Sequence, residues 1–204
     1  MYTPKLYREE DRTRILEFLQ QNDFATVVAH DGEKPVASHL LVEVIEHGGG
    51  WFVNSHMSRA NPLWKVFERN SEILVIFQGP HTYITPTWYN HLNVPTWNYQ
   101  AVHLYGRPRL VTDQEEAYQL LKRLTDRYEK SDLYRMETLP RDFVEKEMKG
   151  VMAFTIEVTQ IQANYKLSQN RNDEDYWNIV SNLETREDEL SHDVAGAMRK
   201  QRPH

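Results

Sequence analysis

Extended segments alternate with tight-turn signals along the first half of the chain. FATVVAH (24–30) has strand composition, and the Asp-Gly pair of HDGEK precedes a second strand, PVASHLLVEVIEH (35–47). Three glycines at 48–50 indicate another turn before WFVNSH (51–56). Neighbouring strands that are joined by such short loops run antiparallel, so we predict a β-meander here.

Three further segments continue the extended pattern. SEILVIFQG (71–79) is almost continuously apolar, which predicts a strand buried on both faces, and HTYITPTWY (81–89) indicates a strand that ends in a proline-broken turn. YQAVHLYGRPRLV (99–111) and VMAFTIEVTQIQANYKLS (151–168) are also typical of strands. About six antiparallel strands without regular βαβ alternation predict a mainly antiparallel β fold, a closed or partly closed barrel with peripheral helices.

Helical patterns lie between and after these strands. REEDRTRILEFLQQND (8–23) predicts a helix with Ile15, Phe18 and Leu19 on one face. A second helix is predicted after Asp113, which has capping-box spacing with Glu116. Its apolar face is formed by Ala117, Leu120, Leu121, Leu124 and Tyr128. A third helix is expected near 140–150, and two weaker patterns follow residue 170. We therefore predict a barrel domain over 1–170 and a C-terminal helical extension over 171–204.

Charge and composition limit the functional classes. The net charge of −6 argues against a broadly basic nucleic-acid surface, and the compact basic run at 199–202 lies in the tail. The chain contains no cysteine, which excludes disulfides and thiolate metal sites. No segment approaches the roughly 20 apolar residues of a membrane span, and the N-terminus lacks a signal-peptide core, so we expect a cytoplasmic protein with no membrane partner.

The stretch HMSRANPLWK (56–65) joins the third strand to a short helix and presents a hydroxyl, a guanidinium and an amide together. One interpretation is helix capping by Ser58 or Asn61, with Arg59 in solvent. The other is a phosphate site, because helix-start amides and a fixed guanidinium both donate to a dianion. Both interpretations stay open from the residues alone.

Other constellations are weaker. Four histidines lie near strands or strand ends, but no HExxH or HxH spacing supports a metal site, and no GxSxG elbow supports a serine hydrolase. WYNHLNVPTWNY (88–99) is dense in rings and amides, which favours a barrel-closing loop or subunit contact over a platform for a planar ligand. YKLSQNR (165–171) is either a polar strand end or a segment that reaches a ligand at a subunit boundary. No residue is identified as a catalytic acid, base or nucleophile, so an enzymatic activity stays open.

Several of these stretches together resemble the PaiB family of FMN-binding split-barrel proteins. The resemblance is carried by IFQGPHTYITPTWY, VPTWNYQAVHLYG, HMSRANP and YKLSQNR, and it extends from YTPKLYREED to residue 171. It implies a six-stranded split β-barrel related to pyridoxamine-phosphate oxidase-like flavoproteins, which are usually homodimers with FMN at the interface. It also implies negative regulation of transcription, because the name-giving members repress sporulation and protease synthesis.

The resemblance also implies a set of FMN-binding residues. A Ser-Arg-Lys turn holds the flavin phosphate in the wider fold; Ser58 and Arg59 match its first two positions, whereas Ala60 and Asn61 stand where the lysine is expected and Lys65 lies one turn further on. Backbone near His39 would line the flavin ring, and residues from the end of the last strand would approach it. The predicted cofactor-binding residues are His39, His56, Ser58, Arg59, Asn61, Lys65, Lys166, Ser168 and Gln169, with no metal ligand.

Alternatives from other classes remain. A flavin-dependent oxidoreductase acting on a small molecule would turn over NAD(P)H with added FMN. A protein that binds or degrades haem, as distant split-barrel relatives do, would give a Soret shift on titration with haemin. Direct DNA binding by a PaiB-like repressor is compatible with the family but is not supported by the net charge.

Overall fold

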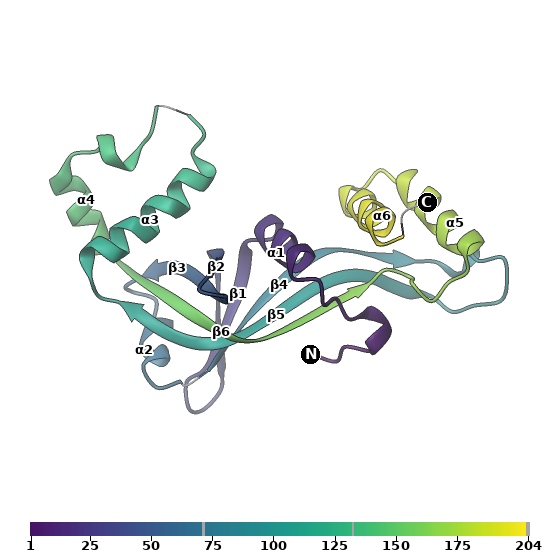
Figure 1. Cartoon of the computed structure of the whole chain (residues 1–204), viewed down its shortest axis with the longest axis horizontal. Helices are drawn as coiled ribbons and strands as arrows, with labels where there is room; N and C mark the ends of the chain where they lie inside the picture. Colours follow the sequence, from purple (N-terminus) through teal and green to yellow (C-terminus); the bar gives the residue numbers. More distant parts are fainter. Residues whose placement is uncertain (71, 132, 203–204) are drawn as a thin grey trace. The chain divides into compact units, whose positions relative to one another are not determined.

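The protein, seen here as a computed structural model that describes residues 1–70, 72–131 and 133–202, is built on a six-stranded barrel (Figure 1). The sheet closes in the order β1–β2–β3–β6–β5–β4. The strands are β1 (Phe24–His30), β2 (Pro35–His47), β3 (Gly50–Ser58), β4 (Ile73–Ile84), β5 (Thr96–Val111) and β6 (Val151–Lys166). The predicted antiparallel barrel with peripheral helices is thereby confirmed.

The helices lie at the chain ends and in the connections between strands. They are α1 (Arg12–Gln21), α2 (Leu63–Phe67), α3 (Gln114–Tyr128), α4 (Arg141–Met148), α5 (Asp173–Glu184) and α6 (Glu189–Gln201), with short 3-10 helices η1 (Lys5–Tyr7), η2 (Pro86–Trp88) and η3 (Met136–Thr138). No helix in the described ranges is both long enough and apolar enough to cross a membrane.

Local signals determine the first hairpin. The carboxylate of Asp31 accepts from the amides of Glu33 and Lys34, both at 2.9 Å, and Gly32 has a φ of 107°, which a side chain would disfavour. The turn brings β1 and β2 into antiparallel register, with Thr26 opposite His39. The Asp-Gly turn predicted from the sequence is therefore present.

The barrel departs from a simple meander after β3. β3 pairs with β6, so that Ser55 lies opposite Phe154, whereas β4 pairs with β1. This arrangement leaves no free edge among the paired strands and buries an apolar interior that includes Val27, Val53 and Phe154.

β4 corrects one expectation about burial. Its first residues alternate between buried and partly buried side chains, with Ile73, Val75 and Phe77 buried and Leu74 and Ile76 half-buried. The apolar run had predicted full burial on both faces. Only one face points into the barrel, and the other is only partly covered, as is usual for a strand of a small barrel.

α3 begins at the predicted cap and packs on the outer face of the sheet. The Asp113 carboxylate accepts from the Glu116 amide at 2.8 Å, and Leu120 and Leu124 form a cluster with Val111 of β5 and Ala153 of β6. Tyr128, which was expected on the same apolar face, is exposed because it is the last residue of the helix.

Contacts divide the chain into two units. The first unit comprises Met1–Phe18, Gln78–Val102 and Gln162–His204, and the second comprises Leu19–Phe77 and His103–Ile161. α5 and α6 pack on each other within the first unit, where the Tyr176 hydroxyl donates to the Met198 carbonyl at 2.6 Å (Figure 1). The two helices predicted after residue 170 are present, and the proposed domain boundary at 170/171 stays a prediction.

Candidate functional site

The turn between β3 and α2 uses its polar side chains largely on itself. The Ser58 hydroxyl accepts from the Ala60 amide at 3.2 Å, and the Asn61 carbonyl oxygen accepts from the Leu63 amide at 3.0 Å. The Asn61 side-chain amide donates to the Ser38 hydroxyl of β2 at 2.8 Å. Asn61 therefore closes the turn that leads into α2 and ties this turn to the neighbouring strand. The N-cap position of α2 is Pro62, which makes no side-chain cap bond, so the predicted capping by Ser58 or Asn61 is replaced by bonds within the turn.

Arg59 is exposed to solvent, and its guanidinium is anchored by backbone carbonyls. Its Nε donates to the Lys149 carbonyl at 3.1 Å and one terminal nitrogen donates to the Val151 carbonyl at 3.4 Å, while its own amide donates to the Gly150 carbonyl at 2.8 Å. These bonds fix the guanidinium at the junction of α4 and β6. Because a guanidinium carries five N–H groups, donors remain for another acceptor.

Arg59 lines a cavity of about 820 Å³ within the second unit. Its walls come from the start of α3, from η3 and α4, and from the first residues of β6. The apolar part includes Val111, Met136, Val144 and Met148. The wall also carries charged side chains of both signs, the cations Arg59, Arg141 and Lys149 and the carboxylates Asp113, Glu115, Glu137 and Glu145. Arg141 is paired with Glu145, so the cavity combines an apolar lining with a mixed set of charges in which the Arg59 guanidinium is fixed by backbone carbonyls.

The remaining predicted residues of the second unit are not gathered into one cluster with Arg59. Lys65 is exposed and its ammonium lies 5.5 Å from the Trp64 ring centroid. His39 is exposed on β2 and stacks on Phe24, with ring centroids 6.2 Å apart. Only Ser58, Arg59 and Asn61 are linked by a shared local geometry.

His56 lies on β3 opposite Ala153 and is partly buried. Its Nδ1 is buried and has no hydrogen-bond partner among the described residues. Burial lowers the pKa of His56 below the ordinary value of 6.5, because a charged imidazolium would be poorly solvated there. The ring is therefore neutral at pH 7, and it is a polar group that the fold itself does not satisfy.

His56 should make the stability of the protein depend on pH. The unfolded chain takes up a proton near pH 6.5, whereas the folded protein does so only at lower pH. Stability is therefore fully present above pH 6.5 and is lost as pH falls toward the folded pKa. We expect urea titrations at pH 7.5 and 5 to show a smaller loss for His56→Phe than for the wild type. Equal losses in the two proteins would contradict the assignment.

Lys166, Ser168 and Gln169 belong to the first unit, around the end of β6. Ser168 is buried, has a φ of 61° and donates through its hydroxyl to the Asn98 side-chain oxygen at 3.0 Å. The Gln169 side chain accepts from the Leu167 amide at 2.7 Å and donates to the Tyr165 carbonyl. Lys166 donates to the Thr96 hydroxyl. Ser168 and Gln169 thus hold the loop in shape, and Lys166 keeps a cation beside it.

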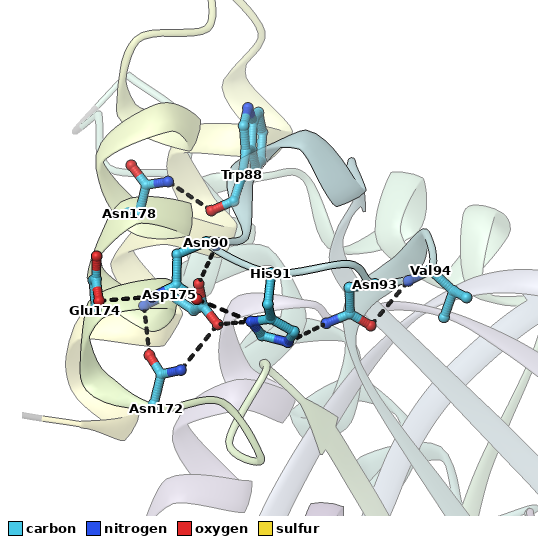
Figure 2. Close-up of polar contacts among 9 residues, drawn as sticks. All are labelled: Trp88, Asn90, His91, Asn93, Val94, Asn172, Glu174, Asp175 and Asn178. Atoms are coloured by element: carbon cyan, nitrogen blue, oxygen red, sulfur yellow. Dashed lines mark hydrogen bonds and ion pairs between the residues drawn. The ribbon is translucent and has the colours of Figure 1, made fainter.

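Hydrogen bonds attach the ring-rich tract (residues 88–99) to α5, as Figure 2 shows. The Asn178 side chain donates to the Trp88 carbonyl at 2.6 Å, and the Asn90 amide donates to an oxygen of Asp175 at 2.9 Å. The other Asp175 oxygen lies 3.2 Å from Nδ1 of His91. These contacts support the interpretation of the tract as a structural loop.

Sequence patterns did not identify Asp175, His91 or Tyr89 as members of one cluster. Asp175 is fully buried, yet it lies more than 80 positions from Asn90, and no local spacing joins them. The donors to Asp175 are the backbone amide of Asn90 and the side chain of Asn172, and neither is marked by a sequence pattern that points to Asp175.

The residues around Arg59 fit the phosphate end of FMN better than its flavin ring. A fixed guanidinium beside a cavity suits a phosphate group. The backbone amides of Ala60 and Leu63 could also have bound a phosphate, but they donate to the side chains of Ser58 and Asn61 within the turn. Binding of the FMN phosphate by Arg59, like the roles of the other predicted residues, stays a prediction.

Comparisons with known proteins agree on one family. Residues 1–160 match the family model described as "Putative FMN-binding domain". The chain is 40% identical over 200 residues to the "Protease synthase and sporulation protein PAI 2" of Bacillus subtilis (strain 168), covering 97% of this chain and 96% of that protein. An uncharacterized protein of Saccharomyces cerevisiae is 36% identical over 100 residues, which cover 46% of this chain and 59% of the yeast protein.

Solved structures show the same fold at low identity. The flavocytochrome Anf3 from Azotobacter vinelandii superposes with a TM-score of 0.62 at 18% identity, covering 84% of this chain and 75% of that one. A FAD and heme binding protein from Mycobacterium smegmatis gives 0.62 at 17% identity, covering 83% and 78%. The barrel is thus a split barrel, and the match over most of the length shows that the chain belongs to the PaiB family of FMN-binding split-barrel proteins.

Proposed function

We propose that the protein is a PaiB-like negative regulator of transcription, acting as a homodimer whose state depends on FMN held at Arg59. The observation that carries the proposal is the 40% identity to the sporulation protein PAI 2 over almost the whole of both chains. FMN, the cofactor named by the family description, supplies redox chemistry when bound. The chain's own contribution is to bind the phosphate and to orient the flavin.

Arg59 is proposed to bind the phosphate because its position is fixed before any ligand arrives. The carbonyls of Lys149 and Val151 hold the guanidinium, so little side-chain entropy is lost when an anion binds. His39, His56, Ser58, Asn61 and Lys65 are proposed to surround the same ligand. Lys166, Ser168 and Gln169, at the end of β6 in the first unit, are proposed as further cofactor-binding residues.

Replacing Arg59 with alanine is expected to weaken FMN binding by about 1–3 kcal/mol, the scale of a charge-assisted hydrogen bond. That corresponds to a roughly 5- to 150-fold increase in Kd. Quenching of flavin fluorescence during titration of the purified protein gives the affinity. Arg69→Ala is the matched control, because Arg69 is an exposed arginine a few residues away.

A thermal melt of each variant separates loss of the ligand from loss of fold, since Arg59 also donates to backbone carbonyls. Equal FMN affinity in the wild type and Arg59→Ala would reject Arg59 as the phosphate ligand. An absorbance spectrum of the freshly purified wild type, followed by FMN titration, tests whether the protein binds flavin at all.

A stable homodimer usually buries a surface of apolar side chains that would otherwise be exposed to water. Leu92, Val94 and Trp97 of the first unit are exposed, and Trp97 forms ring contacts with Tyr83 and His81. Such a gathering of apolar side chains supports their use in the proposed dimer. Light scattering should give twice the mass of the chain, and a monomeric mass at working concentrations would contradict this part of the proposal.

Direct contact with DNA is a separate question. Two arginines of the basic tail are already paired, Arg199 with Glu184 at 2.7 Å and Arg202 with Asp173 at 2.8 Å. These pairs reduce the charge available to phosphates. A gel-shift assay of a candidate promoter at low and moderate salt, with and without FMN, tests direct operator binding.

A further inference from the structure

Two cations at the end of β6 lack a carboxylate partner. Lys166 is the last residue of the strand, and Arg171 lies in the loop that leads to α5, with its guanidinium carbon 4.6 Å from the Tyr89 ring centroid. Within residues 1–70, 72–131 and 133–202, no acidic side chain forms an ion pair with either cation. Partly buried cations without counter-charges are costly unless an anion accompanies them.

Two buried polar atoms beside these cations also have no protein partner. The Tyr89 side chain is about nine-tenths buried, at 8% exposure, and its hydroxyl has no hydrogen-bond partner among the described residues. The same holds for Nε of Arg171. The Arg171 guanidinium also acts on the Tyr89 hydroxyl, but that contact uses the phenol oxygen as an acceptor. The Tyr89 O–H and Arg171 Nε–H donors therefore still lack an acceptor in the described ranges, although buried donors are almost always satisfied.

The nearby carboxylate of Asp175 does not serve as that acceptor. One of its oxygens accepts from the Asn90 amide, and the other accepts from the Asn172 side chain at 3.0 Å and lies beside His91 (Figure 2). Asp175 is thereby committed to joining the ring-rich tract to α5. Its charge offsets part of the local positive potential without pairing with Lys166 or Arg171.

The charges in this region favour a bound anion. Burial lowers the pKa of Lys166, and the charge of Arg171 lowers it further, because neither cation is paired with a carboxylate in the part of the chain that the structure describes. Burial raises the pKa of Tyr89, so its phenol stays protonated and can donate. A bound anion would relieve the repulsion between the cations and accept from the phenol.

The loop that carries Arg171 is held rigidly. Ser168 adopts a left-handed φ of 61°, and the Arg171 amide donates to its carbonyl at 3.0 Å. Arg202 donates to the carbonyls of Gln169 and Arg171, both at 3.1 Å. A non-glycine residue in this conformation costs about 1 kcal/mol or more and often occurs at ligand sites.

We propose that Lys166, Arg171 and the Tyr89 hydroxyl form a binding site for an oxyanion, the phosphate or carboxylate group of a small molecule. The planar guanidinium, the ammonium and the phenol provide a charge-assisted donor set for such a group. The site lies wholly within the first unit, whereas Arg59 belongs to the second. Lys166 is also among the proposed cofactor-binding residues, but Arg171 and Tyr89 are not, and their anion site goes beyond the proposed function.

Equilibrium dialysis of the full chain with radiolabelled inorganic phosphate, at constant ionic strength set by chloride, tests the site. The measurement is made in the Arg59→Ala background, which removes the phosphate ligand of the proposed FMN site. There we expect saturable binding of one phosphate per chain. Adding Arg171→Gln or Lys166→Gln should weaken it at least tenfold, and adding Tyr89→Phe should weaken it severalfold. Adding Lys200→Gln, at an exposed lysine of α6, should leave this binding unchanged.

Tyr89→Phe provides the decisive variant, because its hydroxyl has no partner in the fold and its removal should leave the melting temperature unchanged or higher. Competition by acetate as strong as that by unlabelled phosphate would identify a carboxylate site, and weaker competition would identify a phosphate site. Absence of saturable binding, or equal binding in Arg59→Ala with and without Arg171→Gln, would overturn the proposal. Loss of FMN binding in Arg59→Ala with phosphate binding retained would show that the two sites are independent.

Discussion

Replacing Phe154 with alanine is expected to destabilise the folded protein by about 3–5 kcal/mol, the usual cost of removing a large aromatic side chain from a core. Phe154 is fully buried in the barrel on β6, opposite Ser55 of β3. Its ring meets Phe67 of α2 edge-on, with centroids 5.1 Å apart. The substitution therefore removes both barrel packing and the contact that seats α2.

Urea unfolding followed by far-UV circular dichroism measures this effect. Phe143→Ala is the matched control, because Phe143 lies on α4 and is 47% exposed, so its loss should change stability by no more than about 0.5 kcal/mol. Because α2 follows the turn that contains Arg59, we also expect weaker FMN binding in Phe154→Ala at temperatures where it is still folded. Similar unfolding midpoints for the two variants would contradict the barrel interior described here.

Local chemistry made several elements predictable. Asp31 and Gly32 specify the first turn by side-chain acceptance and a positive φ, and neither effect needs any distant part of the chain. The Asp113 carboxylate likewise specifies the start of α3 by accepting from the nearby Glu116 amide. Such signals act within a few residues, so a sequence pattern contains all the information they need.

Strand pairing was less predictable, because it depends on segments that are far apart. Hairpin signals join β1 to β2 and β2 to β3, but nothing in the sequence of β3 indicates that its other neighbour is β6 rather than β4. The choice is made when the barrel closes and buries Phe154 against β3. For the same reason, the burial of β4 was overestimated from its apolar run.

The residues of the candidate sites also fall into two groups, those whose contacts are local in the sequence and those whose contacts depend on distant segments. The polar turn of Ser58 and Asn61 was recognisable from neighbouring positions, although its side chains close the turn and do not cap α2. The anchoring of Arg59 by residues 149–151 required the return of β6. Tyr89 and Arg171 meet across about 80 positions. Their unsatisfied atoms become visible only when the partners of every buried polar group are counted.

Gly106 marks the second position where a single change should have a large effect. A Cβ atom there would lie 2.5 Å from the Glu157 carbonyl oxygen and 2.5 Å from Cγ2 of Ile156, both on β6. Real Cβ atoms do not approach backbone that closely, so β5 and β6 would have to separate. We expect Gly106→Ala to destabilise the protein by about 3 kcal/mol or more, at or above the upper end of ordinary overpacking.

Gly50→Ala tests whether this loss comes from the close approach or simply from replacing a strand glycine. A Cβ at Gly50 would have no neighbour nearer than 3.6 Å. Alanine should therefore fit and stabilise β3 by up to about 1 kcal/mol, since glycine loses more backbone entropy on folding. Chemical denaturation of both variants should thus give changes of opposite sign. A mild effect at Gly106 would mean that β5 and β6 can separate at this point, and the packing that closes the barrel would then be looser than its contacts indicate.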